Sequence, residues 1–276
     1  SLMEMDPVKL TNGELVDLNT LQPVPGGLFD NSLAFNNKYG YIQLPFKIPN
    51  PAFEEVITNI LGITKDQLRK ILSGEVALPE DLQKRVLNMA ASIKGVKSAS
   101  LVEPKNTLTG PRAIELAVNT YSLPELEERT SKLLSGKSKT DRAKGVKLMR
   151  YLRGMQRNNL QPSDYLIEKV PVIPAKFRPF NVVGDSFQAG DVNVLYRDLY
   201  QVLNSHGELQ SALGETESLG NTLNVYDSVK ALYGQGDPVL PKTRARGVSG
   251  FLKKVIGNTA KFSFFQRKLQ SKPVDY

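Results

Sequence analysis

Three prolines in one short segment constrain the fold of this chain more than any other feature. Pro171, Pro174 and Pro179 each fix their own φ, and each moves the preceding residue away from helical geometry. Residues 170–180 are therefore expected to be extended and stiff. This stiff segment lies between residues 51–160, which are expected to form a helical unit, and residues 191–233, which are expected to form a helical hairpin.

Residues 51–160 show the apolar spacing of amphipathic helices. Gly62 stands where a helix is expected to end, and Thr64 with Gln67 predicts a capping box at the start of the next one. Further helices are expected near Pro79, Ser122 and Asp141, the last with Val146, Met149, Tyr151 and Leu152 on its apolar face. Core packing is the better explanation of these leucine-rich faces than a groove for a partner.

Residues 191–233 predict an antiparallel helical hairpin. Two apolar faces, over 192–203 and 225–233, flank a polar connector that contains Gly207, Gly214 and Gly220. The pair could be internal to a bundle or could project as a docking hairpin. Residues 1–50 contain many turn formers and predict loops with one or two short strands.

These patterns predict a predominantly helical α+β protein with several parts. The expected divisions are 1–50, 51–160 and 161–276. The architecture expected is clamp-like, with a projecting helical hairpin and irregular basic loops.

The basic side chains are concentrated near the C-terminus. Residues 242–272 hold nine bases and no acid, whereas the rest of the chain holds 27 bases and 28 acids. Such a run is typical of a surface that binds a polyanion. Interleaved apolar side chains, including Phe251, Phe262 and Phe265, favour a folded surface over a disordered tail. Gly247, Gly250 and Gly257 fit either a backbone that turns sharply or approaches nucleic acid closely, or simple flexibility.

Composition excludes several kinds of site. The chain has no cysteine and one histidine, so thiolate zinc sites and His-pair metal sites are excluded, and no metal or catalytic residue is expected. His206 lies in a polar, turn-like context and is expected to face solvent with no functional role. No apolar run is long enough to span a membrane and no leader is evident, which predicts a cytoplasmic protein.

Three blocks resemble the largest subunit, of β′ type, of multisubunit DNA-directed RNA polymerases. Residues 171–179 (PVIPAKFRP) resemble the Pro-Val-x-Pro-Pro-x-x-Arg-Pro segment that begins the lid loop of that family. Residues 190–197 (GDVNVLYR) resemble the start of its clamp helices, Asp-Leu-Asn-x-Leu-Tyr-Arg. Residues 269–276 (LQSKPVDY) resemble its switch element, Leu-x-Gly-Lys-Arg-Val-Asp-Tyr. The three occur in the family's order and spacing.

Weaker resemblance reaches the N-terminus. Residues 26–30 and 38–44 are similar to early Gly-Leu-Phe and Gly-His-Ile-x-Leu elements, but the cysteine zinc ribbon that the family usually carries between them is absent. Residues 51–160 correspond to the family by position only. Pro273, Ser271 and Ala175 depart from the family pattern, which suggests a divergent relative such as one that a phage encodes and that acts in the host cytoplasm.

The resemblance implies a subunit piece that does no bond chemistry itself. The family's catalytic loop, Asn-Ala-Asp-Phe-Asp-Gly-Asp, which would bind Mg²⁺ in the complete polymerase, does not occur in this sequence. No cofactor is therefore expected in this chain. The chain is expected to be either a truncated piece or the N-terminal part of a split subunit, and its partners are expected to be the remaining polymerase subunits or the C-terminal part of the same subunit.

The resemblance also assigns site residues. Template DNA and the RNA–DNA hybrid would be contacted by basic side chains of the lid, rudder and switch positions: Lys176, Arg178, Lys242, Arg244, Arg246, Lys253, Lys254, Lys261, Arg267, Lys268 and Lys272. An initiation factor would dock on the hairpin through Asp191, Asn193, Tyr196 and Arg197. Two alternatives remain open: a self-contained nucleic-acid-binding or regulatory protein, and a peripheral membrane protein that uses the basic stretch on anionic lipid. The Gly- and Pro-rich sequence argues against the second.

Overall fold

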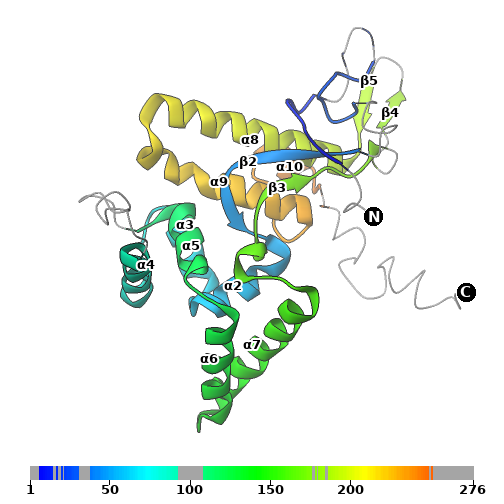
Figure 1. Cartoon of the computed structure of the whole chain (residues 1–276). Coiled ribbons are helices and arrows are strands. Elements are labelled where there is room, and N and C mark those ends of the chain that lie inside the picture. Colours follow the sequence, from blue (N-terminus) through cyan, green and yellow to red (C-terminus); the bar gives the residue numbers. More distant parts are fainter. Residues whose placement is uncertain are drawn as a thin grey trace, which may run out of the picture. The chain divides into compact units, whose positions relative to one another are not determined.

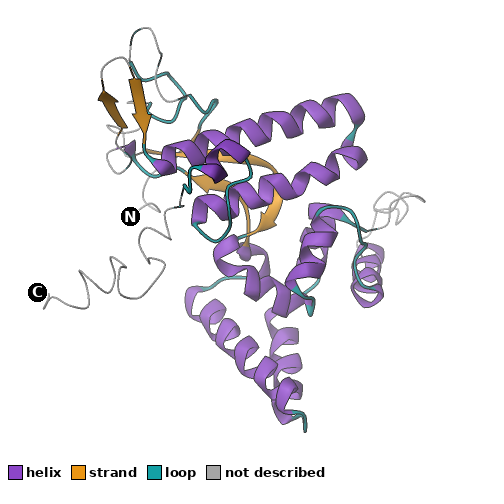
Figure 2. Cartoon of the chain, turned by 180° about the vertical axis from the view of Figure 1, so that it is seen from behind, coloured by secondary structure: helices purple, strands orange, loops and turns teal. Residues whose placement is uncertain are grey.

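The computed structural model describes residues 6–14, 17, 20, 22–30, 38–92, 108–175, 178, 180–183, 186–248 and 250. The fold is α+β and predominantly helical, as the sequence predicts (Figures 1 and 2). Contacts divide the chain into two compact units: Ser1–Pro45 with Lys169–Ala212 and Asn224–Tyr276, and Phe46–Glu168 with Leu213–Leu223. We call these the first unit and the helical unit. The three-part division at 50 and 160 stays a prediction.

The helical unit contains most of the expected helices. Their bounds are η2 Pro51–Phe53, α2 Glu54–Leu61, α3 Lys65–Leu72, α4 Glu80–Ser92, α5 Gly110–Asn119, α6 Leu123–Ser135, α7 Lys139–Asn158 and η4 Pro162–Tyr165. The capping box of α3 is confirmed, because the Gln67 amide donates to Thr64 Oγ1 at 3.1 Å and the Thr64 amide donates to Gln67 Oε1 at 2.8 Å. Gly62 ends α2 with φ +71°.

Helix α5 was not predicted. Its first residues, Gly110 and Pro111, suggest a turn in the sequence, but proline in the first helical turn loses no intrahelical hydrogen bond. The helix is a central part of the core, with Ala117 and Val118 fully buried. Tertiary packing therefore decides its conformation.

Helices α6 and α7 contact each other, and they lie closest near the turn that joins them and diverge away from it (Figure 1). Helix α7 begins at Lys139, earlier than expected, because Ser138 caps it by accepting a hydrogen bond from the Asp141 amide. Leu152 is buried as predicted, but Val146 is 57% exposed. The expected place of Val146 in the core is therefore wrong.

The strands form two small sheets. In the first, the order is β1 (Asp6–Lys9), β2 (Lys38–Pro49) and β3 (Leu166–Pro171), with β1 parallel to β2. In the second, β4 (Phe180–Val183) pairs with β5 (Ser186–Ala189) in antiparallel register. The strand β2 has 12 residues and is longer than the short strands expected before residue 50.

The hairpin connector is much shorter than the sequence suggests. Helix α8 runs over Asp191–Leu213 and α9 over Glu215–Tyr233, so Gly207 and Gly220 are helical and Gly214 alone, with φ +93°, makes the turn. After it, α9 turns back alongside α8 (Figures 1 and 2). Within the helical unit, Leu219 packs over Gly110, where an added Cβ would lie 2.7 Å from Leu219 Cδ2.

A short helix, α10 (Pro241–Ala245), follows the hairpin. Among the described helices, none combines the length and the apolar character that a membrane crossing requires.

Candidate nucleic-acid interface

Three of the segments that carry the resemblance meet at one buried arginine in the first unit. Arg178 is 4% exposed, and its guanidinium donates from Nε to the Ile173 carbonyl at 2.5 Å, from Nη1 to Asn193 Oδ1 at 2.5 Å and from Nη2 to the Leu28 carbonyl. The Phe29 ring lies 4.9 Å from the guanidinium carbon. We call these residues, together with Tyr196, the Arg178 cluster. It joins residues 26–30, 171–179 and 190–197.

Helix α8 supplies the other side of the cluster. Asn193 and Tyr196 are fully buried, and both bond to the proline-rich loop. Asn193 Nδ2 donates to the Arg178 carbonyl at 2.9 Å, whereas the Tyr196 hydroxyl donates to the Pro171 carbonyl at 2.9 Å and accepts from the Ile173 amide at 3.1 Å. The start of α8 therefore fixes the position of the loop that precedes it.

Burial also shifts the acid–base properties of the cluster. Desolvation lowers the pKa of Arg178 from 12.5 to about 10, so the guanidinium is still charged at neutral pH. Desolvation raises the pKa of Tyr196 to about 12, partly opposed by the Ile173 amide and by the charge of Arg178. The Arg178 charge is thus held by several hydrogen bonds and by two aromatic rings, of Phe29 and Tyr196.

The first described basic residues of the C-terminal stretch lie on α10 and at its C-terminal end. Lys242, Arg244 and Arg246 are exposed, and Arg244 Nε donates to the Pro238 carbonyl at 2.9 Å. Between them Thr243 is buried and faces Asp198 of α8. Burial raises the pKa of Asp198, while the Thr243 hydroxyl and the nearby charges of Arg197 and Arg246 oppose that rise. The buried side of α10 is therefore fixed to α8, and its basic side chains face solvent.

Gly250 is explained by protein packing. A Cβ at this position would overlap the Ala231 carbonyl oxygen and the Gly234 amide nitrogen at the end of α9. Gly247 adopts a left-handed φ of +63° and makes a turn. The sharp turn expected as one explanation is therefore found at Gly247, whereas the close approach at Gly250 is to α9, and an approach to nucleic acid stays a prediction. Gly257 lies outside the described residues.

The predicted nucleic-acid contacts therefore fall into three groups. Lys242, Arg244 and Arg246 are exposed; Arg178 is buried and bonded to protein acceptors, so its role in nucleic-acid binding stays a prediction. The others lie outside the described residues: Lys176, Lys253, Lys254, Lys261, Arg267, Lys268 and Lys272.

The predicted docking residues differ in accessibility. Arg197 is exposed and Asp191 is half-buried, whereas Asn193 and Tyr196 face inward in the Arg178 cluster. Their role in docking stays a prediction. Farther along α8, Leu209 is a large apolar side chain that is 39% exposed.

His206, expected to face solvent, is 3% exposed because the helix continues through the sequence that suggested a turn. Its burial lowers the pKa of the imidazole.

One basic surface was missed by sequence reasoning. Residues 139–158, which form α7, hold seven bases and one acid. This excess is hidden in the balanced charge of the chain outside 242–272. A count in a window of one helix length would have found it.

Comparisons with known proteins extend the resemblance. No protein-family profile matches the chain. The DNA-directed RNA polymerase subunit beta′ of Corynebacterium diphtheriae is 26% identical over 177 residues, which cover 60% of this chain and 13% of that subunit. The DNA-directed RNA polymerase subunit gamma of Synechococcus sp. strain RCC307 is 26% identical over 244 residues, 86% of this chain and 37% of that subunit.

The chain is related to RNA polymerase β′ and γ subunits. The subunit beta′ of Corynebacterium efficiens gives a similar result, with 28% identity over 178 residues. This β′-like chain spans only 13% of the β′ relatives and 37% of the γ relative just described. The match to γ extends over most of the chain, so it includes at least part of the helical unit for which sequence motifs gave no alignment.

Proposed function

We propose that this chain is the N-terminal portion of a β′-like subunit of a DNA-directed RNA polymerase, and that it holds template DNA and the RNA–DNA hybrid while another chain or segment performs nucleotidyl transfer. The observation that carries the proposal is the Arg178 cluster. Three separate segments that resemble the β′ family pack on one buried side chain. A chance likeness of short motifs would not require them to meet.

Each part has a distinct role in this proposal. The Arg178 cluster positions the proline-rich lid loop, whose Lys176 would stand near the upstream end of the hybrid. The exposed side chains of α10, at the rudder position, and the basic residues from Lys253 to Lys272 bind phosphates. Contacts to the backbone position a strand without reading its sequence, as transcription of any template requires.

Catalysis is assigned to residues outside this chain. Within the described ranges, no three acidic or histidine side chains gather closely enough to hold a metal ion. The Mg²⁺ of such a polymerase would be bound by the aspartate loop, which this sequence does not contain.

We also propose that α8 docks an initiation factor. Arg197 and Leu209 are exposed on this helix, as are the residues from Gly207 to Ala212, which leaves a solvent-facing stretch for a partner. Arg197→Glu and Leu209→Ser should each weaken capture of the cognate factor, whereas Lys9→Glu, also on an exposed site of the first unit, should not. Equal capture by all four proteins would refute docking on α8.

The binding of nucleic acid is tested by its salt dependence. The double variant Lys242→Ala/Arg246→Ala should reduce the log–log slope of single-strand affinity against salt by about 1.4, since each lost phosphate contact contributes about 0.7. Fluorescence anisotropy with a labelled DNA strand measures this slope. The matched control Lys9→Ala/Lys84→Ala removes the same charge from exposed residues that belong neither to α10 nor to the basic stretch. Identical slopes for the two variants would refute phosphate binding by α10.

A further inference from the structure

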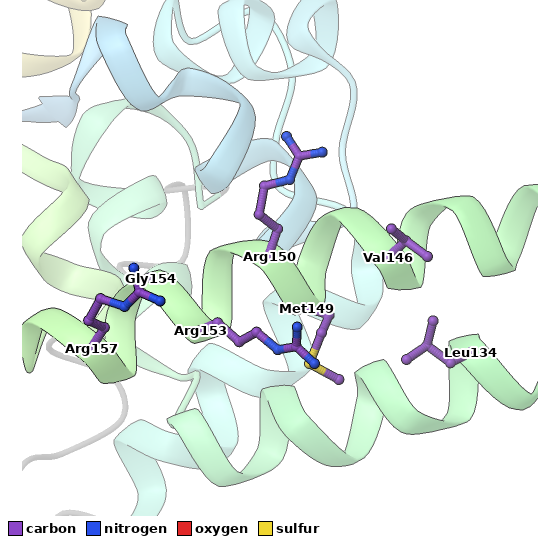
Figure 3. A pocket seen from close by; sticks show the side chains of 7 residues that line it. All are labelled: Leu134, Val146, Met149, Arg150, Arg153, Gly154 and Arg157. Carbon is purple, nitrogen blue, oxygen red and sulfur yellow. The ribbon is translucent and has the colours of Figure 1, made fainter.

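A second charged surface lies in the helical unit, between α6 and α7. A groove of about 610 Å³ is lined by Leu134 of α6 and by Val146, Met149, Arg150, Arg153 and Arg157 of α7. Figure 3 shows Leu134 projecting from α6 toward α7, and Met149 and Arg153 projecting from α7 toward α6. We call this the α6–α7 groove.

The positions of the three arginines form a row along α7, with the Arg153 side chain directed toward α6 and the Arg150 side chain away from it (Figure 3). Positions 150, 153 and 157 follow the i, i+3, i+7 spacing that places side chains on one helical face, over roughly 10 Å of helix length. All three are exposed, and none makes a salt bridge with any residue that the structure describes. By contrast, the neighbouring Lys147 pairs with Glu55 at 2.8 Å. The row is therefore available to an external anion.

Gly154 lies in the lining of the groove, between these arginines. Glycine is disfavoured inside a helix, so its presence calls for a reason such as close packing. Apart from its two chain neighbours and the adjacent backbone of its own helix, no described atom of the chain lies within 4 Å of the place where its Cβ would stand. No packing inside the chain accounts for Gly154, and a small residue here leaves the groove open to a close approach from outside.

The chemistry of the lining favours a protein segment over a nucleic acid. Bases bind through stacking on aromatic side chains, and the residues that line the groove include none. Instead, Leu134, Met149 and the 57% exposed Val146 offer aliphatic surface beside the arginine row. An amphipathic helix with carboxylates along one edge and aliphatic side chains along the other would satisfy both features, because arginine pairs with carboxylates through two parallel hydrogen bonds.

We propose that the α6–α7 groove binds an acidic amphipathic helix of a partner protein, with carboxylates on Arg150, Arg153 and Arg157 and aliphatic side chains against Leu134, Val146 and Met149. This site is formed by other residues than the proposed nucleic-acid surface of the first unit. It depends only on the charge and shape of the groove, so it can hold or fail independently of the polymerase assignment.

The test uses the full chain and a fluorescein-labelled synthetic helix with glutamates at i, i+3 and i+7 and leucines along the adjacent edge. Fluorescence anisotropy should show saturable binding. Arg150→Glu/Arg153→Glu should weaken binding at least about tenfold, and a matched peptide with lysines in place of the glutamates should bind this variant more tightly than wild type. This charge exchange separates a direct contact from a folding defect.

Glycine variants test the shape of the groove. Gly154→Leu should weaken binding of the acidic helix about tenfold, whereas Gly220→Leu should not. Gly220 is the control, because like Gly154 it is inside a helix and without neighbours at its Cβ position, although it is exposed whereas Gly154 is half-buried.

Three outcomes would overturn the proposal. The first is no saturable binding of the acidic helix by the full chain. The second is equal affinity of wild type and Arg150→Glu/Arg153→Glu. The third is displacement of the peptide by a single-stranded oligonucleotide that the double variant no longer binds, which would assign the groove to nucleic acid.

Discussion

Arg178→Ala should strongly destabilise the first unit. The substitution leaves the Ile173 and Leu28 carbonyls and Asn193 Oδ1 buried without their donor, and each such group costs about 1–3 kcal/mol. Part of this loss of stability is offset, because alanine leaves no buried charge to desolvate. The lowering of the Arg178 pKa from 12.5 to about 10 corresponds to a desolvation cost of roughly 3 kcal/mol. The lost side-chain volume and ring contacts add to the penalty. The net loss expected is about 3–5 kcal/mol.

Chemical denaturation followed by circular dichroism measures this loss, because the chain has no tryptophan to report by fluorescence. Hydrogen exchange should locate the effect, with faster exchange in residues 26–30, 171–175 and 190–197. Arg153→Ala is the matched control: it is an exposed arginine without a described ion pair and should change stability by less than about 0.5 kcal/mol. A loss of less than about 1 kcal/mol for Arg178→Ala, with unchanged exchange in those segments, would refute the structural role of the Arg178 cluster.

Three further predictions concern single side chains. Tyr196→Phe should lower the free energy of unfolding by about 1–3 kcal/mol at neutral pH. Because burial raises the pKa of Tyr196 from 10 to about 12, wild type should lose this extra stability as pH rises from about 10 toward 12. Parallel curves of unfolding free energy against alkaline pH for the two proteins would contradict this. His206 is the one histidine of the chain, and burial lowers its pKa, so the unfolded state binds more protons than the folded state near pH 6. The free energy of unfolding of wild type should therefore fall as pH falls below about 6.5. In chemical denaturation between pH 7 and about pH 5.5, His206→Gln should remove this dependence on pH. Gly250→Ala should lower the free energy of unfolding by about 2–3 kcal/mol because the methyl group meets the backbone at the end of α9, and a neutral effect in the same assay would show that this approach is not tight.

Local rules predicted much of the helical unit. The capping box at Thr64, the stop at Gly62 and the apolar spacing depend on neighbours within one or two turns, so the sequence displays them directly. Helix α5 was not predicted from the sequence, because its first two residues suggest a turn and because its conformation depends on the helices that surround it. The length of the hairpin connector was overestimated, because Gly207 and Gly220 suggest a connector in the sequence although both lie within helices.

The site was predictable in outline only. The proline-rich segment and the start of α8 were recognised from sequence, but the inward direction of Arg178, Asn193 and Tyr196 depends on contacts between residues far apart in the chain, such as Arg178 with Leu28. Charge counting found the C-terminal basic stretch and missed α7, because the acids of other segments offset it in the sum. Val146 illustrates the same limit, since an apolar residue at helical spacing can line a groove instead of a core.

The most direct test of the central claim is a photo-crosslink within the transcribing complex. A photoreactive amino acid replaces Lys242, the tagged full chain is purified with its associated subunits, and the complex is assembled on an RNA–DNA scaffold and allowed to extend the RNA. We expect RNA extension and a crosslink from position 242 to nucleic acid that is absent without the scaffold. A purified assembly that extends no RNA, or a crosslink that forms only to protein whether or not the scaffold is present, would contradict the account.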